Sequence, residues 1–376
     1  MKCRLIFVEH NGNKNKFYNM EVVGDKLNVE FGRVGSTPQT ATYPSSMFNN
    51  KKREKLHKGY EDITHLYVED ASSNLTFHKI EPRVKSLFEC LFEYTNISVR
   101  TNYNFNTSSV TQKHIDLAQE QLDAISKSSS IFNIQQACQK LFMIFPRKMT
   151  RVADYIPTTD WSIERLSKFI ADEQDILDSL KGSVTFNNTS QFQLSDYGLV
   201  DCTTDIDKQE LLKIQQLVGT SRFKDVYKAI HKNEPEFINH VTNAKNNTTK
   251  LLIHGSRSQN ILSILKSGLQ IRPTGAYYSG SAYGDGLYHA DKLEKSLGYC
   301  GGSKDKFIML QEVHVGNQYE YVGRNRHDKP NNFFTKDYLA SIGHDSVFAK
   351  GGNDLLNNEY IVYSPQQTVL KYLLWY

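Results

Sequence analysis

The sequence lacks any apolar run that approaches the roughly 20 residues needed for a membrane-spanning helix. The apolar part of the segment from Met1 to Glu9 is also too short for a secretory signal peptide. We therefore expect no membrane partner. We expect an intracellular protein that is nuclear in a eukaryote and cytoplasmic otherwise.

Cysteine is scarce, and its spacing excludes the usual zinc motifs. The five cysteines stand singly, with no Cys-x-x-Cys pair and no histidine at zinc-ligand spacing. They are Cys3, Cys90, Cys138, Cys202 and Cys300. This pattern is typical of free thiols in a reducing compartment, and it predicts that no metal is bound.

The chain has little excess charge of either sign, with a formal net charge of +4. Since the whole molecule is not a polycation, nucleic-acid binding would require a local cluster of positive residues. The clearest cluster comprises Lys51, Lys52, Arg53, Lys55 and Lys58, with Glu54 among them. A solvated surface face is an equally good interpretation of this run, and a nuclear-import signal is a weaker one.

The composition and length indicate two or three soluble domains with ordinary cores, because the 376 residues are 39% hydrophobic and 23% charged. Residues 1–78 are predicted to be β-rich. The segment Cys3 to Glu9 alternates weakly, and Phe17 to Val23 and Lys26 to Phe31 indicate a hairpin around Gly24 and Asp25.

Helical periodicity dominates residues 79–198. Apolar residues recur at helical spacing in three runs: Ile115, Ala118, Leu122 and Ile125; Ile131, Ile134, Ala137, Leu141 and Ile144; and Ile163, Leu166, Ile170 and Leu177. Residues 199–376 return to a mixed pattern, with a helix expected over 208–218 and strands over 307–315, 358–363 and 368–376. Glycine and turn residues are dense between Gly275 and Gly302, which is typical of a binding cleft built from loops.

The most informative segment runs from Lys250 to Ser256, where an apolar strand leads into His254, Gly255 and Ser256. The glycine permits a ligand to approach the backbone, and its neighbours supply a ring nitrogen and a hydroxyl to the same small volume. Three further motifs follow in order: Tyr283 to Asp291, Lys295 to Cys300 and Asn358 to Tyr363. This ordered set resembles the catalytic domain of poly(ADP-ribose) polymerases, which are diphtheria-toxin-like ADP-ribosyltransferases with a His-Tyr-Glu triad.

The N-terminal part resembles a second module of the same family. The run from Phe31 to Gly35, with Arg33 in its turn, is similar to the signature of the DNA-sensing WGR domain, and Lys58-Gly59-Tyr60 matches a later turn. Phe31 replaces the tryptophan of that signature, and a core phenylalanine followed by a glycine-bounded turn is the alternative. If the resemblance holds, the DNA contacts are Phe31, Arg33, Lys51, Lys52 and Arg53.

The resemblance implies a multidomain α+β protein. Residues 1–78 would form a small β-rich WGR-like domain, and residues 79–198 an all-α helical bundle with a regulatory role. Residues 199–376 would form a mixed α+β ADP-ribosyltransferase domain with a split antiparallel sheet. A plain helical bundle that only links two domains would produce the same periodicity in the middle segment.

The resemblance also implies which residues bind NAD. Gly255 would hold the nicotinamide carboxamide through its backbone, with the Ser256 hydroxyl as a further donor. Tyr299 would stack on the pyridine ring, and Tyr288 would form the opposite wall. Ser296 belongs to the same expected NAD-binding set.

The implied catalytic residues are His254, Tyr288, Lys295 and Glu359. His254 would bind a ribose hydroxyl of the adenosine half of NAD. Glu359 would bind the nicotinamide-ribose 2′-hydroxyl and favour the positive transition state, with Lys295 close to its carboxylate. One carboxylate is enough, because nicotinamide leaves as a neutral molecule and needs no proton. Taken singly, each of these residues is more often structural, so their order and spacing carry the prediction.

Two departures bear on the product. Polymer-forming relatives usually carry a tyrosine where this chain has Asn357, and bulkier residues where it has Ser281 and Ala282. We therefore expect short chains. The resemblance itself implies transfer to proteins, including the enzyme itself, and stimulation by DNA ends or nicks. The alternatives are a mono-ADP-ribosyltransferase that acts independently of DNA, and a catalytically silent nucleic-acid-binding scaffold, although the intact triad disfavours the scaffold.

Overall fold

A computed structural model describes residues 1–66, 80–105, 110–187, 192–219, 223–271, 282–322, 334–352 and 355–376. The contacts divide the chain into two compact units: residues 1–73 with 96–188, and residues 74–95 with 189–376. The predicted borders at residues 78 and 198 stay a prediction.

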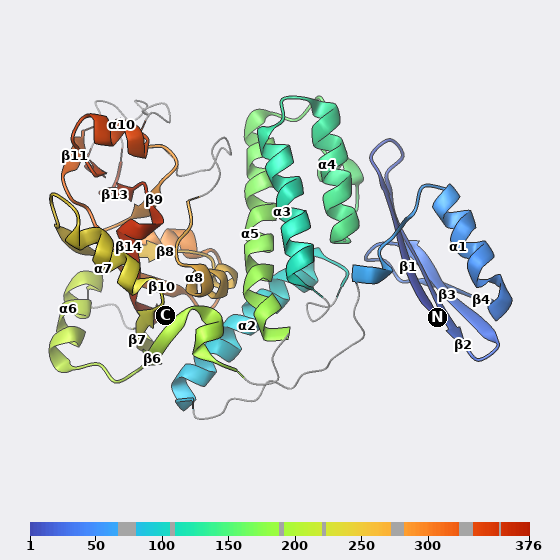
Figure 1. Ribbon diagram of the computed structural model, residues 1–376, viewed down its shortest axis with the longest axis horizontal. Coiled ribbons are helices and arrows are strands. Elements are labelled where there is room, and N and C mark those ends of the chain that lie inside the picture. The colour runs from blue at the N-terminus through green and yellow to red at the C-terminus, as the bar shows by residue number, and fades with distance from the viewer. Residues whose placement is uncertain are drawn as a thin grey trace. The chain divides into compact units, whose positions relative to one another are not determined.

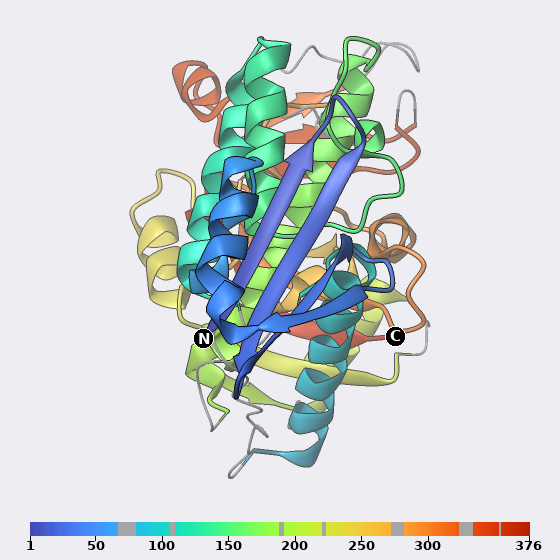
Figure 2. The same cartoon turned by 90° about the vertical axis from the view of Figure 1, so that its right-hand side faces the viewer.

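The first unit begins with a five-stranded antiparallel sheet in the order β4-β3-β2-β1-β5. Its elements are β1 (Lys2–Glu9), β2 (Lys14–Val23), β3 (Lys26–Arg33), β4 (Gln39–Pro44), α1 (Phe48–His57) and β5 (Glu61–Asp62). The predicted hairpin is confirmed, because Val23 pairs with Lys26 and Gly24 takes the left-handed conformation (φ 63°) that the turn requires. Phe48 of α1 packs in one cluster with Leu5 and Leu27 of the sheet, so the helix covers one sheet face (Figures 1 and 2).

Four helices follow: α2 (Pro82–Asn102), α3 (Gln112–Lys127), α4 (Ile131–Ile144) and α5 (Ile163–Asn187). In the first unit α3, α4 and α5 run side by side (Figure 1). The predicted face of α3 is buried: Ile115, Ala118, Leu122 and Ile125. Ile163 of the third apolar run is 75% exposed, because it is the first residue of α5 and precedes the turns that pack.

The second unit contains two sheets. A five-stranded antiparallel sheet has the order β6-β7-β14-β10-β8, and a four-stranded sheet has the order β11-β12-β13-β9. The strands are β6 (Leu199–Thr203), β7 (Asp225–His231), β8 (Thr249–Gly255), β9 (Leu287–His289), β10 (Phe307–His314), β11 (Gln318–Tyr321), β12 (Ser346–Ala349), β13 (Glu359–Val362) and β14 (Thr368–Trp375). The split sheet is therefore present, but β11 and β12 are parallel, contrary to the all-antiparallel expectation. The connection between them contains α10 (Lys336–Ser341), a crossover of the kind that parallel pairing needs.

Helices and apolar clusters hold these sheets together. The other helices of this unit are α6 (Lys208–Val218), α7 (Glu234–Thr242), α8 (Ile261–Ser267) and α9 (Leu293–Leu297). One buried cluster joins Leu252 and Val313 of the first sheet to Leu287 and Val362 of the second. Among the described residues, no helix is both long and apolar enough to cross a bilayer.

The first part of α2 belongs to the second unit. The ring of Phe88 lies 4.7 Å from that of Phe192 and 5.2 Å from that of Tyr197. The Tyr94 hydroxyl donates to the Asp305 carboxylate at 2.9 Å. The predicted helical segment therefore begins with residues that belong, by their contacts, to the unit that follows it.

Candidate active site

Backbone pairing brings three distant segments of the second unit together. Ile253 of β8 and Ala290 exchange two backbone hydrogen bonds, each of 2.8 Å. Strand β9 pairs antiparallel with β13, so that Tyr288 lies opposite Ile361. The end of β8, the middle of β9 and the start of β13 therefore meet, and they carry His254, Tyr288 and Glu359.

His254 is held in one tautomer by its neighbour. Its Nδ1 lies 2.9 Å from the Tyr288 carbonyl oxygen, and since a carbonyl only accepts, Nδ1 carries the proton. Burial lowers the pKa of His254, although the bond to Tyr288 opposes part of that shift. The ring is therefore neutral near pH 7, with Nε2 left to accept a hydrogen bond.

Gly255 ends β8 at a place where no other residue fits. A Cβ atom there would lie 2.0 Å from the carbonyl oxygen of Ser296, which is far inside van der Waals contact. Ser296 lies on α9, is buried, and donates its hydroxyl to the Ile253 carbonyl at 3.3 Å. The sequence indicated that a glycine here frees the backbone for a ligand, and the structure adds that the backbone of α9 occupies one side of it.

Glu359 and Lys295 form an ion pair in a largely enclosed setting. The Lys295 ammonium contacts Glu359 Oε1, and the side chains are only 14% and 8% exposed. Glu359 is the first residue of β13, and Lys295 lies in the middle of the short helix α9. The structure therefore brings together the two residues that the resemblance had placed near each other.

The two aromatic residues predicted to enclose the nicotinamide, Tyr288 and Tyr299, differ in how firmly their side chains are held. The Tyr288 hydroxyl donates to the Gly284 carbonyl at 2.8 Å and accepts from the backbone N–H of Tyr283 at 3.0 Å, so this ring is fixed. Tyr299 is 50% exposed and can meet a ligand. Burial raises the pKa of Tyr299, and the charge of Glu359 raises it further, which indicates that the ring lies near that carboxylate.

Three further residues of the predicted cleft are Ser281, Ala282 and Asp285. Ser281 lies outside the described residues, whereas Ala282 packs on the buried cluster that contains Tyr283. Asp285 was not singled out in the sequence, yet it lies half-buried between Gly284 and Gly286, and burial raises its pKa. A carboxylate inside a glycine-bounded turn was the only signal that could have drawn attention to it.

The residues predicted to contact DNA are engaged within the first unit. Arg33 donates through Nε to the Met149 carbonyl at 2.8 Å and through Nη2 to the Thr150 carbonyl at 2.9 Å. Phe31 is partly buried, and its ring lies 5.8 Å from that of Tyr18. These contacts favour structural roles for both residues, and their DNA contacts stay a prediction.

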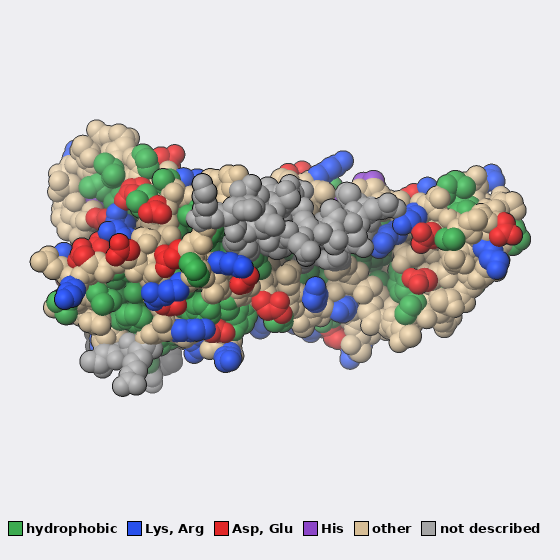
Figure 3. Space-filling model, turned by 90° about the horizontal axis from the view of Figure 1, so that it is seen from below, with side chains coloured by type: hydrophobic (Ala, Val, Ile, Leu, Met, Phe, Trp, Pro, Cys, Tyr) green, Lys and Arg blue, Asp and Glu red, His purple; other side chains and the backbone are tan. Residues whose placement is uncertain are grey.

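The basic run on α1 is also partly neutralised. Lys52 pairs with Asp62 at 2.6 Å, and the ammonium of Lys55 lies 4.2 Å from the ring centroid of Tyr18. Arg53 donates to the Asn50 side chain at 2.9 Å, and Lys51 pairs with Glu54 at 3.6 Å. On the molecular face in Figure 3, basic and acidic side chains are interspersed rather than gathered by sign.

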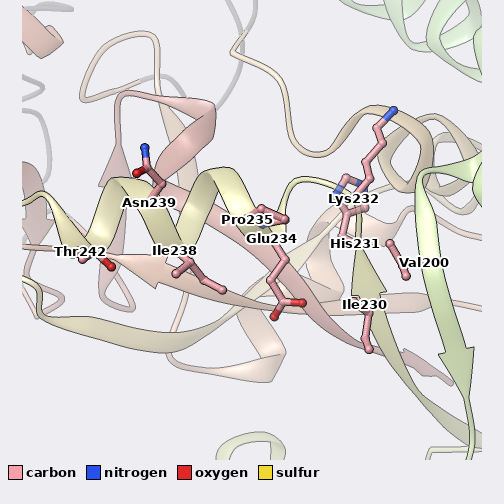
Figure 4. A pocket seen from close by; sticks show the side chains of 9 residues that line it. All are labelled: Val200, Ile230, His231, Lys232, Glu234, Pro235, Ile238, Asn239 and Thr242. Carbon is pink, nitrogen blue, oxygen red and sulfur yellow. The ribbon is translucent and has the colours of Figure 1, made fainter.

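A groove elsewhere in the second unit contains none of the predicted site residues. It is lined by side chains of β6, β7 and α7 and of the turn before α7: Val200, Ile230, His231, Lys232, Glu234, Pro235, Ile238, Asn239 and Thr242 (Figure 4). Its apolar members include Val200 and Ile238, which are exposed. Two of its polar side chains are engaged within the unit, because His231 Nε2 bonds to the Leu265 carbonyl at 2.8 Å and Glu234 pairs with Lys371.

Comparisons with known proteins match two regions of this chain to family models. The family model of the poly(ADP-ribose) polymerase catalytic domain matches residues 202–376, and that of the WGR domain matches residues 1–66. A putative poly [ADP-ribose] polymerase-like protein, 100L of Invertebrate iridescent virus 6, is 35% identical over 167 residues, which are 44% of this chain and 87% of the viral protein. The uncharacterized protein 101L of the same virus is 31% identical over 191 residues, covering 49% of this chain and 78% of 101L.

A cellular relative is a longer protein, of which only part matches. The poly [ADP-ribose] polymerase of Drosophila melanogaster is 29% identical over 215 residues, which are 51% of this chain and 20% of the fly protein. The site and these matches define a transferase of the ADP-ribosylating class that uses NAD. The chain belongs to the poly(ADP-ribose) polymerase family, and it joins a WGR domain to a catalytic domain. The resemblance drawn from the motifs is thereby confirmed.

Proposed function

We propose that this protein transfers ADP-ribose from NAD to proteins, including itself, and extends short chains, with stimulation by broken DNA. The observation that carries the proposal is the meeting of His254, Tyr288 and Glu359 around Gly255, with Lys295 paired to the carboxylate. A scaffold without activity would have no need of an enclosed ion pair beside an exposed tyrosine.

The nicotinamide half of NAD is held by backbone and rings. The N–H and C=O of Gly255 pair with the carboxamide, and the Ser256 hydroxyl adds a donor. The half-exposed ring of Tyr299 stacks on the pyridine, and Tyr288 closes the other side. Ser296 supports this pocket, because its hydroxyl bonds to β8 and its carbonyl lies against Gly255.

The chemistry is then mainly electrostatic. Nicotinamide leaves as a neutral molecule, so the enzyme must stabilise the positive charge that develops at the anomeric carbon and orient the acceptor. Glu359 binds the 2′-hydroxyl of that ribose and stabilises the charge, while Lys295 orients the carboxylate. His254 is neutral with its proton on Nδ1, so Nε2 accepts from a ribose hydroxyl of the adenosine half.

The same proposal includes regulation by DNA and short products. The WGR domain supports binding to nucleic acid, and the contacts of Arg33 with residues 149–150 support a route from that domain to the helices. Asn357 supports short products, because an asparagine offers less stacking surface than tyrosine to an incoming ADP-ribose. The competing function is mono-ADP-ribosylation without DNA, and sizing the products made with and without broken duplex separates the two.

The test of the transferase assignment is Glu359→Gln. The glutamine keeps the shape but loses the charge, so the barrier is expected to rise by about 2–4 kcal/mol while nicotinamide still binds. The measurements are nicotinamide release from NAD and calorimetric binding of nicotinamide. Glu320→Gln is the control, since Glu320 is an exposed carboxylate of β11 that pairs only loosely with Lys350 at 3.5 Å. Transfer at the wild-type rate in Glu359→Gln would overturn the assignment.

A further inference from the structure

One carboxylate outside the predicted triad contacts both chain neighbours of Glu359. Asp291 lies three residues after Tyr288 and four before Lys295 in the chain. The Asn358 side-chain amide donates to Asp291 Oδ2 at 2.7 Å, and the Tyr360 hydroxyl donates to the same oxygen at 3.3 Å. The residues on either side of the predicted catalytic glutamate are therefore tied to a single oxygen atom.

The partners of Asp291 are themselves fixed. Asn358 accepts a hydrogen bond from the backbone N–H of Gly351 at 2.9 Å through its other atom, Oδ1. Tyr360 is only 8% exposed, and its ring lies 4.8 Å from that of Phe348. The three bonds among Asp291, Asn358, Tyr360 and Gly351, here called the Asp291 latch, thus connect the segments that follow β9 and β12 to the start of β13.

The latch acts on the strand from the side opposite the carboxylate. Glu359 and Tyr360 are successive residues of β13, so their side chains point to opposite faces: Tyr360 reaches Asp291, and Glu359 reaches Lys295. Strand β13 begins at Glu359, so Asn358 lies outside the strand and is held by its side-chain bonds. A carboxylate oxygen can accept more than one hydrogen bond, as Asp291 Oδ2 does here.

We propose that Asp291 is a positioning residue for ADP-ribosyl transfer, which sets Glu359 against Lys295 and Tyr288 through Asn358 and Tyr360. This inference rests on the proposed function. It predicts that breaking the latch lowers kcat and leaves nicotinamide binding intact, because Gly255, Ser256 and Tyr299 lie on other segments.

The experiment exchanges the two polar side chains. Asn358→Asp brings two carboxylates into contact, and kcat for nicotinamide release is expected to fall about ten- to a hundredfold, as a misplacement near 1 Å would cause. The double variant carries both Asp291→Asn and Asn358→Asp, so that the amide and the carboxylate trade places. The amide at position 291 then donates to the carboxylate at position 358, and that carboxylate still accepts from Gly351. We expect kcat of the double variant to return to within about threefold of the wild type. Such a recovery is expected because the effects of mutations at two contacting residues are not additive.

The readouts separate positioning from general damage. Nicotinamide affinity, measured by calorimetry, is expected to stay within about twofold in all variants, and the KM for NAD is expected to change far less than kcat. Unchanged kcat in Asn358→Asp, a double variant no better than the single one, or a parallel loss of nicotinamide affinity would each overturn the inference. Absence of NAD consumption by the wild-type chain would instead overturn the proposed function, and the inference with it.

Discussion

At the scale of single residues, His289 is a buried polar side chain directly beside the site. It is 2% exposed, both ring nitrogens are buried without a well-formed hydrogen bond among the described residues, and its ring lies 5.7 Å from that of His254. Burial, and to a smaller extent His254, lowers its pKa to about 3, although the backbone of Leu287 and Tyr360 opposes part of that shift. The protein therefore keeps a neutral, polar ring next to a predicted catalytic histidine.

His289→Phe is expected to stabilise the protein, and more so in acid. An unfolded histidine titrates near pH 6.5, so the unfolded state binds a proton between about pH 6.5 and 3 that the folded state excludes. The free energy of unfolding of the wild type therefore falls as the pH drops through this window, by about 2 kcal/mol at pH 5 from His289 alone. Phenylalanine has no such loss. Urea unfolding at about pH 7.5 and about pH 5 measures the difference.

The control is Phe132→Leu, because Phe132 is an exposed residue of α4 and carries no titrating group. The stability of this variant relative to the wild type should be the same at both pH values. If the gap between His289→Phe and the wild type does not widen from the neutral to the acidic buffer, His289 is not excluded from protonation in the folded state.

At the scale of secondary-structure elements, α5 carries ion pairs in both buried and exposed settings. Glu173 is buried, pairs with Arg147 Nη1 at 2.6 Å and accepts from the Tyr103 hydroxyl. Asp172, one position earlier, pairs with Lys168 at 2.6 Å on the exposed face of the same helix. The same chemistry is thus placed in two environments within one element.

Glu173→Ala is expected to cost about 3–5 kcal/mol of unfolding free energy, since it leaves the Arg147 guanidinium buried without its counter-charge. Asp172→Ala is the matched control and should cost about 1 kcal/mol or less, because exposed pairs contribute little. Urea unfolding of the full chain, followed through the helical signal, gives both values. Equal losses in the two variants would mean that the burial of the Arg147 pair carries no energetic weight.

The regulatory role of the helical segment can be tested by deletion. The deletion must keep the first part of α2, because that part packs on the second unit. Deletion of 96–188 with a short linker keeps the part of α2 whose Phe88 packs on Tyr197. We expect this variant to consume NAD faster than the full chain without DNA, because the proposed regulatory helices are gone. Deletion of 81–194 removes Phe88 and is expected to lower the melting temperature. A folded 96–188 deletion that is no more active than the full chain would exclude the regulatory role.

At the scale of the whole molecule, the proposal couples DNA binding to catalysis. Broken duplex is expected to raise the rate of NAD consumption, and the effect should weaken between low and physiological salt, because phosphate contacts release counterions. The measurement is the rate with nicked or linear duplex against closed circular DNA at several salt concentrations. If no nucleic acid changes the activity and no gel shift is seen at low salt, the N-terminal domain does not couple DNA binding to catalysis.

Local patterns by themselves determined the family, the β-rich start, the helical middle and the motif residues of the site. The spacing of apolar residues and the preferences of turn residues depend on only a few neighbouring positions. The hairpin at Gly24 and the buried face of α3 therefore follow from the sequence. The order of His254, Tyr288 and Glu359 likewise predicts the chemistry without coordinates.

Only the tertiary structure decided which distant residues touch. The parallel pairing of β11 with β12, the contact of Gly255 with the Ser296 carbonyl, the engagement of Arg33 and the latch at Asp291 all join segments that local periodicity cannot relate. Such contacts depend on how sheets and helices pack, and a lone aspartate or arginine has no sequence signal for its partner. The sequence therefore predicted chemical roles for side chains around the site, whereas only the fold shows which of these side chains touch.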